Sequence, residues 1–128
     1  MKIVGQGLDL IECERVAVVV ARHGQRFLDR VLTPCEQAYC NTHRNSIPRI
    51  AGRFAAKEAI LKMLGTGWRG KIAWTDMEIT NDPAGRPQVA LTGDTARIST
   101  EQGICRVLVS ITHTPNYAAA TAIGLAED

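Results

Sequence analysis

The chain has 128 residues, 45% of them hydrophobic and 22% charged, a size usual for one domain, so we expect a single domain spanning residues 1–128. Its formal net charge of +2 is far from the basic balance of a dedicated nucleic-acid-binding protein, so any positive field must be local. The four cysteines form no CxxC pair and no apolar signal segment opens the chain, so we expect a cytoplasmic protein with free thiols.

The first half of the chain is expected to hold one strand and three helices, at residues 2–10, 12–22, 25–32 and 34–41. The strand is rich in β-branched and small residues, and the first helix is amphipathic and stops at Gly24. Its apolar run, residues 16–21, is too short to cross a bilayer, which takes about 20 residues. Thr33, Pro34 and Glu36 have the pattern of a capping box, which predicts the start of the third helix.

A long helix is predicted from Ile47 and Pro48 to about Gly65, where glycine supplies a natural stop. The second half of the chain has mainly the alternating pattern of strands. We expect strands at residues 76–80, 87–91, 105–114 and 117–125, with a short helix at residues 95–103. The turn-rich segment NDPAGRP predicts a hairpin between the first two of these strands. The sequence therefore predicts an α+β fold in which helices cover one side of an antiparallel sheet.

The long helix carries two cations among its apolar residues. At about 100° per residue, one broad apolar arc contains Phe54, Ile60, Leu61, Met63 and Leu64. Arg53 and Lys57 fall inside this arc, and burying an unpaired charge costs several kcal/mol. Either these side chains extend past the edge of the arc into solvent, or this side faces an anion such as phosphate. With the glycine-rich residues Gly65, Thr66 and Gly67, they form a predicted phosphate-binding group.

Two carboxylates are candidates for a metal site. Asp9 ends the first strand and, taken alone, has the position of a turn or helix-capping residue. Glu58 and Lys62 lie four residues apart, as in an ordinary surface ion pair. If the first strand packs beside the long helix, however, Asp9 and Glu58 supply two hard oxygen ligands. Mg²⁺ is typically held by one or two carboxylates, with phosphates and water completing its coordination.

The segment SITHT, residues 110–114, ends a strand with Thr112 and Thr114 beside His113. This histidine is either a hydrogen-bonded residue at a strand edge or a further phosphate-binding group. Together with the carboxylates and the cations, it favours a phosphate-bearing substrate and a divalent metal.

Four segments, in order and spacing, carry a family resemblance: GLDLIECER, GRFAAKEAILKMLGTG, WTDMEITNDPAGRPQVAL and VSITHTPNYAAATA. Together they resemble holo-[acyl-carrier-protein] synthases, the small bacterial type of 4′-phosphopantetheinyl transferase. The resemblance implies transfer of 4′-phosphopantetheine from coenzyme A to a serine of apo acyl carrier protein, in cytoplasmic fatty acid biosynthesis. It also implies a homotrimer whose sites lie between adjacent subunits.

The resemblance assigns roles to individual residues. Asp9 and Glu58 are expected to hold Mg²⁺ on the pyrophosphate of coenzyme A, with Lys62 near the same phosphates. Thr112 and His113 are expected at coenzyme A, with His113 near the 3′-phosphate. In the transfer itself, Glu58 would accept the serine proton directly or through a metal-bound water, and Lys62 would neutralise the leaving phosphate.

Arginines recur along the first two predicted helices, at intervals of seven, four and four residues: Arg15, Arg22, Arg26 and Arg30. Such a stripe is either a solvated face or a docking surface for an acidic partner, and carrier proteins are acidic. We interpret Arg15, Arg22 and Arg26 as carrier-binding residues, with Phe27 and Leu28 as an apolar centre.

Two other functional classes remain possible from the sequence. A non-catalytic module that binds coenzyme A or a nucleotide would need the cations but not the pair Asp9 and Glu58. A small RNA-binding protein would explain the arginine stripe, but the modest charge and the 5% aromatic content disfavour it.

Overall fold

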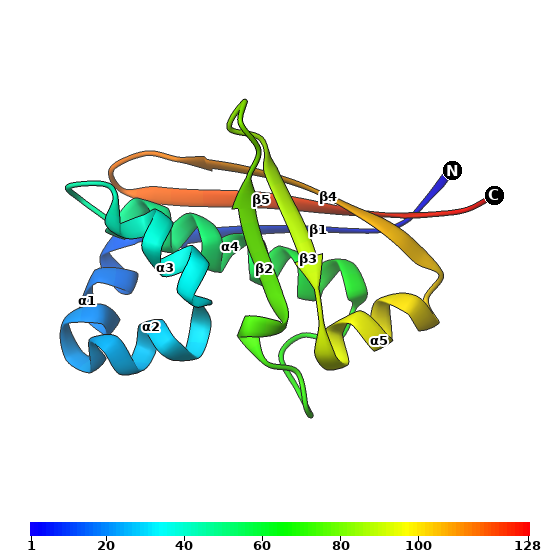
Figure 1. The fold of residues 1–128 in the computed structure, drawn as a ribbon, viewed down its shortest axis with the longest axis horizontal. Coiled ribbons are helices and arrows are strands. Elements are labelled where there is room, and N and C mark those ends of the chain that lie inside the picture. The colour runs from blue at the N-terminus through cyan, green and yellow to red at the C-terminus, as the bar shows by residue number, and fades with distance from the viewer.

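The computed structural model describes all 128 residues (Figure 1). The elements, in chain order, are β1 (Lys2–Glu12), α1 (Cys13–His23), α2 (Gln25–Val31), α3 (Pro34–Asn41), α4 (Ile47–Leu64), the 3₁₀ turn η1 (Trp74–Asp76), β2 (Met77–Asn81), β3 (Pro87–Leu91), α5 (Gly93–Glu101), β4 (Ile104–His113) and β5 (Tyr117–Ala126). Every helix and strand expected from the sequence is present, with no end displaced by more than two residues. The 3₁₀ turn was not predicted.

The three long strands form one antiparallel sheet in the order β1-β5-β4. Asp9 on β1 and Ile111 on β4 both pair with Ala120 of the central strand, so these three residues form one row across the sheet. Helix α4 lies along one face of this sheet (Figure 1). The sheet is thus layered against the helix that carries Glu58.

Glycine lets α4 approach β1 closely. A Cβ atom added to Gly7 would lie 1.9 Å from the carbonyl oxygen of Ala59, and one added to Gly5 would lie 2.5 Å from that of Met63. Any larger residue at these positions would push the helix away from the strand. Because Glu58 precedes Ala59 directly, the same close packing brings Glu58 to the strand that carries Asp9.

The predicted hairpin is confirmed, but it belongs to a separate sheet. β2 and β3 pair only with each other, from Met77 with Leu91 to Asn81 with Pro87. Figure 1 shows this hairpin crossing the direction of the long strands. One sheet was expected from the sequence. Alternation of apolar and polar residues identifies strands but does not say which strands share hydrogen bonds.

Residues that are close in sequence determine where α3 begins and where α4 ends. The capping box of α3 is present: the Thr33 side chain accepts from the Glu36 amide at 3.3 Å, and the Glu36 carboxylate accepts from the Thr33 amide at 2.9 Å. Helix α4 ends at Gly65, whose φ of 76° is the left-handed conformation that glycine adopts without strain. These two boundaries follow from residues that are close in sequence.

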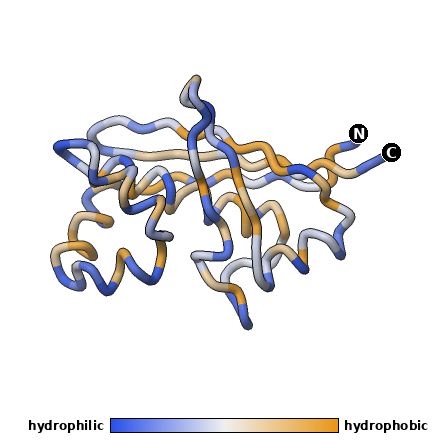
Figure 2. The backbone as a smooth tube through the Cα atoms, viewed as in Figure 1, coloured by the Kyte–Doolittle hydropathy of each residue, from blue (hydrophilic) through white to orange (hydrophobic).

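Packing leaves one face of the long sheet uncovered. The inner face packs on α4 as part of a core cluster of 22 buried residues. On the outer face, Leu8 and Leu10 are 62% and 65% exposed, and Leu108 is 41% exposed. Figure 2 shows hydrophobic stretches along the strands and hydrophilic residues in connections such as the bend between α3 and α4. No helix combines the length and apolar character that a membrane span requires.

Candidate active site

Asp9 and Glu58 line the same pocket, of about 360 Å³, which we call the carboxylate pocket. Its other lining residues are Leu10, Ile11, Arg15, Val16, Val19, Phe27 and Phe54. β1, α1, α2 and α4 therefore all contribute to it. The expectation that Asp9 and Glu58 approach one another is confirmed, and it depends on the close packing of α4 on β1.

Lys62 lies beside the two carboxylates and contacts Asp9. Its Nζ donates to the Asp9 carboxylate at 3.1 Å and to the Leu8 carbonyl at 2.9 Å. The ammonium group is therefore paired with Asp9 rather than with Glu58, one turn earlier on the helix. Because the Lys62 side chain is 53% exposed, it is also accessible to a ligand that enters from solvent.

The electrostatics of the carboxylate pocket suit a cation. Burial raises the pKa of Glu58, the nearby Asp9 carboxylate raises it further, and Lys62 partly opposes both effects. Two carboxylates held this close repel each other, and a divalent cation between them would relieve the repulsion. No group of three or more His, Cys, Asp or Glu side chains converges as a metal site. Asp9 and Glu58 thus fit Mg²⁺ only if substrate oxygens or water complete its coordination.

The prediction that Lys57 contacts a phosphate is wrong. Its side chain is fully buried, and its Nζ donates to the Glu36 carboxylate at 2.6 Å, to the Val31 carbonyl at 2.6 Å and to the Trp74 carbonyl at 3.2 Å. All three donor positions are used within the protein. The Lys57 ammonium group, which we expected to need an external anion, is paired with the Glu36 carboxylate inside the protein. Lys57 is therefore part of the core.

Arg53 differs from Lys57 because it lines a small pocket. This hollow of about 190 Å³, the cationic pocket, is bordered by Tyr39, Pro48, Arg49, Gly52, Arg53, Asn81, Gly85, Pro87, Ile111 and His113. The Arg53 guanidinium donates to Asn81 and lies over the Tyr39 ring, 4.0 Å from its centroid. The Nε atoms of Arg49 and Arg53 are both buried without a hydrogen-bond partner. Two arginines and a histidine that border one small pocket give it the chemistry to bind an anion.

Arg49 was not among the site residues expected from the sequence. It lies four residues before Arg53, so the two face the same side of α4, but it falls outside the motif that drew attention to Arg53. His113 reaches the same pocket from the end of β4. Thr112 pairs with Ala119 and is exposed. Since neighbouring strand residues point to opposite faces, Thr112 does not share the cationic pocket with His113.

The glycine-rich segment after α4 is not brought to the carboxylates. Gly65 and Thr66 line a different hollow, of about 470 Å³, together with Arg69 and Arg97. Gly67 also has a positive φ, 61°. The structure accounts for Gly65 as the end of α4, so its conformation needs no ligand to explain it.

The arginines expected to bind the carrier do not all lie at the same place. Arg15 lines the carboxylate pocket, whereas Arg22 and Arg26 are exposed on α1 and α2. Phe27 of α2 lines the carboxylate pocket as well. Of the two residues expected to form an apolar centre beside the arginines, Phe27 is thus part of the wall of the candidate site, and Leu28 does not line it.

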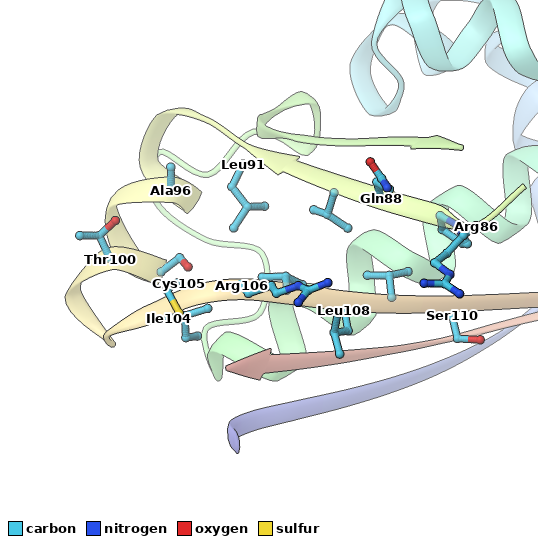
Figure 3. Close-up of a pocket in the computed structure, with 15 residues that line it drawn as sticks. Arg86, Gln88, Leu91, Ala96, Thr100, Ile104, Cys105, Arg106, Leu108 and Ser110 are labelled. Atoms are coloured by element: carbon cyan, nitrogen blue, oxygen red, sulfur yellow. The ribbon is translucent and has the colours of Figure 1, made fainter. Parts of the chain in front are cut away.

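The largest hollow lies elsewhere. It measures about 860 Å³ and runs between β3, α5 and β4, with Gln88, Leu91, Thr100 and Leu108 among its lining residues (Figure 3). None of the site residues expected from the sequence lines it. The chemistry of the carboxylate and cationic pockets, rather than their size, identifies them as the candidate site.

Comparisons with known proteins agree with this geometry. The family described as the 4′-phosphopantetheinyl transferase superfamily matches residues 5–122. A holo-[acyl-carrier-protein] synthase of Koribacter versatilis is 43% identical over 121 residues, covering 94% of this chain and 97% of that protein. The solved holo-[acyl-carrier-protein] synthase of Neisseria meningitidis has a TM-score of 0.88 and 31% identity, covering 97% of this chain and 99% of its own. That of Helicobacter pylori, solved in complex with coenzyme A, has a TM-score of 0.83 and 28% identity, covering 94% and 99%.

Proposed function

The chain belongs to the 4′-phosphopantetheinyl transferase superfamily, and we infer from this that it is a holo-[acyl-carrier-protein] synthase. It transfers 4′-phosphopantetheine from coenzyme A to a serine of apo acyl carrier protein and releases adenosine 3′,5′-bisphosphate. The observation that carries this conclusion is the pairing of Asp9 and Glu58 in one pocket, in a chain that matches such synthases over nearly its whole length. A cytoplasmic location and a role in fatty acid biosynthesis follow as proposals from this substrate.

We propose that the carboxylate pocket receives the pyrophosphate of coenzyme A. Asp9 and Glu58 would hold Mg²⁺ there, and the ion when bound would neutralise charge on the pyrophosphate. The serine oxygen of the carrier forms a bond to the β-phosphorus as the bond from that phosphorus to the bridging oxygen breaks. The electron pair leaves with adenosine 3′,5′-bisphosphate, and the serine proton passes to the Glu58 carboxylate. Lys62, within reach of Asp9 at 3.1 Å, is placed to neutralise the leaving oxygen.

Glu58 suits this role because of its surroundings. Burial and Asp9 raise its pKa, which makes the carboxylate a better proton acceptor than an exposed glutamate. The apolar walls formed by Val16, Phe27 and Phe54 reduce the access of water, which would compete with serine for the phosphorus. The same walls can pack against the methyl and methylene groups of the pantetheine arm.

We propose that the cationic pocket takes the 3′-phosphate of coenzyme A. Arg49, Arg53 and His113 border this pocket together. These groups are the kind that bind a phosphate dianion. Of the coenzyme-binding residues expected from the sequence, Arg53 and His113 are kept in this proposal and Lys57 is not. Thr112 and residues 65–67 stay as predictions without a contact assigned.

We propose that the protein is a homotrimer with shared sites. Asp9 and His113 lie on the two edge strands, β1 and β4, with β5 between them, which separates them by roughly 10 Å across the sheet. The exposed leucines of the outer sheet face offer an apolar surface to another copy. A contact between two different surfaces of neighbouring copies can close into a ring. Such a ring would place one copy's cationic pocket beside the next copy's carboxylate pocket.

The trimer proposal predicts complementation between inactive variants. Glu58→Gln damages only the carboxylate pocket and His113→Ala only the cationic pocket, so a mixed trimer contains some sites with neither change. We expect sedimentation at micromolar concentration to give a trimer, and the two variants, unfolded and refolded together, to recover part of the wild-type rate. Refolding each variant alone is the control. A fully active monomer would rule the shared site out.

The reaction itself separates the enzyme from a module that merely binds coenzyme A. Chromatography measures the release of adenosine 3′,5′-bisphosphate. This release should require both coenzyme A and apo carrier protein. A binding module would retain coenzyme A intact whether the carrier is present or not. Holo carrier protein, whose serine is already modified, is the matched control and should yield no product.

A further inference from the structure

Four aromatic rings form a continuous row from the carboxylate pocket to the protein surface. Phe27 and Phe54 line the pocket, with ring centroids 6.3 Å apart. Phe54 lies 5.0 Å from Trp74, and Trp74 is stacked on Trp68 at 6.1 Å with only 8° between the ring planes. The row thus joins α2, α4, η1 and the loop before η1.

The outer end of this row is exposed. Trp74 is buried, but Trp68 is 47% exposed. The Arg30 guanidinium lies over the Trp68 ring, 5.4 Å from its centroid. A tryptophan left in water forgoes the favourable burial of one of the largest apolar side chains. Contacts with the Arg30 guanidinium and with the stacked Trp74 ring restrict the Trp68 side chain, which lowers the conformational entropy lost when a partner binds.

The charges around Trp68 are mainly positive. Arg26 lies one helical turn before Arg30 on the same side of α2, and Arg69 and Lys71 follow Trp68 in the loop; all are exposed. Asp29 also lies on α2, but its carboxylate accepts hydrogen bonds from the amides of Gln25 at 2.7 Å and Gln37 at 3.1 Å. Asp94 lies near Lys71 and is paired with Arg97. Arg30 and Arg69 form no salt bridge with either acid.

We propose that Trp68 and Arg30 form a docking anchor for the acidic carrier protein. The anchor would extend the arginine stripe of α1 and α2 to the loop after α4; Figure 1 shows α2 and this loop on the side of α4 that faces away from the long sheet. Tryptophan and arginine are the residues most enriched among those that dominate binding energy. The surrounding cations complement an acidic surface, and the aromatic row connects the anchor to the pocket where the serine must arrive.

This inference rests on the proposed function, because it names a surface for the carrier that the reaction requires. It is narrower than that function, since a carrier docked only through α1 and α2 would leave Trp68 exposed to solvent. The two can therefore be tested independently.

The unmodified protein offers a direct test, because it has only two tryptophans, one exposed and one buried. Acrylamide quenches the fluorescence of exposed tryptophan and hardly reaches a buried one. Adding an apo carrier protein that lacks tryptophan should reduce the quenching of Trp68 toward the level of a buried residue. Unchanged quenching at a carrier concentration that saturates transfer would overturn the proposal. If no transfer occurs at all, the proposed function fails instead.

Variants then test the anchor kinetically. Trp68→Ala and Arg30→Glu should each raise the KM for carrier protein about tenfold or more, as loss of an anchor residue does. The KM for coenzyme A and kcat at saturating carrier should stay within about twofold of wild type. Trp68→Phe should recover most of the loss. Lys2→Ala, which removes an exposed cation at the start of β1, is the control without effect. Equal increases in both KM values would assign these residues to the coenzyme site and overturn the proposal.

Discussion

Replacing Glu58 with glutamine is expected to lower kcat for phosphopantetheine transfer by about 10²–10⁴-fold, the range usually lost with a general base. Glutamine has nearly the same shape but accepts no proton and is a poor ligand for Mg²⁺. Asp9→Asn should give a loss of similar size, because it removes the other carboxylate of the pocket and the partner of Lys62. Steady-state kinetics with saturating coenzyme A and carrier protein measures both losses.

The fold should survive these substitutions. Neither carboxylate is held in the core, and the repulsion between Asp9 and Glu58, which raises the pKa of Glu58, is removed by either change. Thermal unfolding should therefore show no loss of stability in either variant. Glu127→Gln, at an exposed position near the C-terminus, is the control for charge removal and should keep full activity. Near-normal turnover in Glu58→Gln at ordinary Mg²⁺ concentration would remove Glu58 from the reaction.

Replacing Lys57 with methionine is expected to destabilise the protein by about 3–5 kcal/mol, the usual cost of breaking a buried ion pair. Glu36 would remain buried, still accepting from the amides of Thr33 at 2.9 Å and Ile79 at 3.0 Å, but its negative charge would have lost its partner. The carbonyls of Val31 and Trp74 would lose a donor as well. Urea unfolding at a fixed protein concentration measures this loss, since the proposed trimer would make stability depend on concentration.

Lys62→Met is the matched control on the same helix. The Lys62 side chain is 53% exposed, so its loss should change stability by less than about 1 kcal/mol. The two variants should therefore have opposite profiles: Lys57→Met is unstable, whereas Lys62→Met is stable and slow in transfer. A Lys57→Met protein of normal stability with weak coenzyme A binding would restore the original phosphate-binding interpretation of Lys57.

The contrast between Lys57 and Arg53 shows where inference from sequence succeeds and where it ends. Helical periodicity correctly places both residues on the inner side of α4, but it cannot name their partners. Glu36 lies 21 residues from Lys57 and is recognisable in the sequence only as part of a capping box. In the folded protein its two carboxylate oxygens do more: one caps α3 and pairs with Lys57, and the other accepts from the Ile79 amide. Only the tertiary structure reveals that combination.

The approach of Asp9 and Glu58 was predictable for a different reason. Asp9 lies on a strand with two small residues, Gly5 and Gly7, and Glu58 on a helix rich in alanine, so close packing is possible between them. The capping box, the hairpin and the end of α4 likewise depend on neighbouring residues. Arg49 and the separate β2–β3 sheet depend on contacts between distant segments, which no local pattern records.

Intact-mass spectrometry of apo acyl carrier protein tests the central claim most directly. After incubation with this protein, coenzyme A and Mg²⁺, the carrier should gain the mass of one 4′-phosphopantetheine group. The gain should disappear when the metal is chelated, and also when the acceptor serine of the carrier is replaced by alanine. A carrier whose mass is unchanged under conditions where the protein demonstrably binds coenzyme A would contradict the account and leave a coenzyme-binding protein without transferase activity.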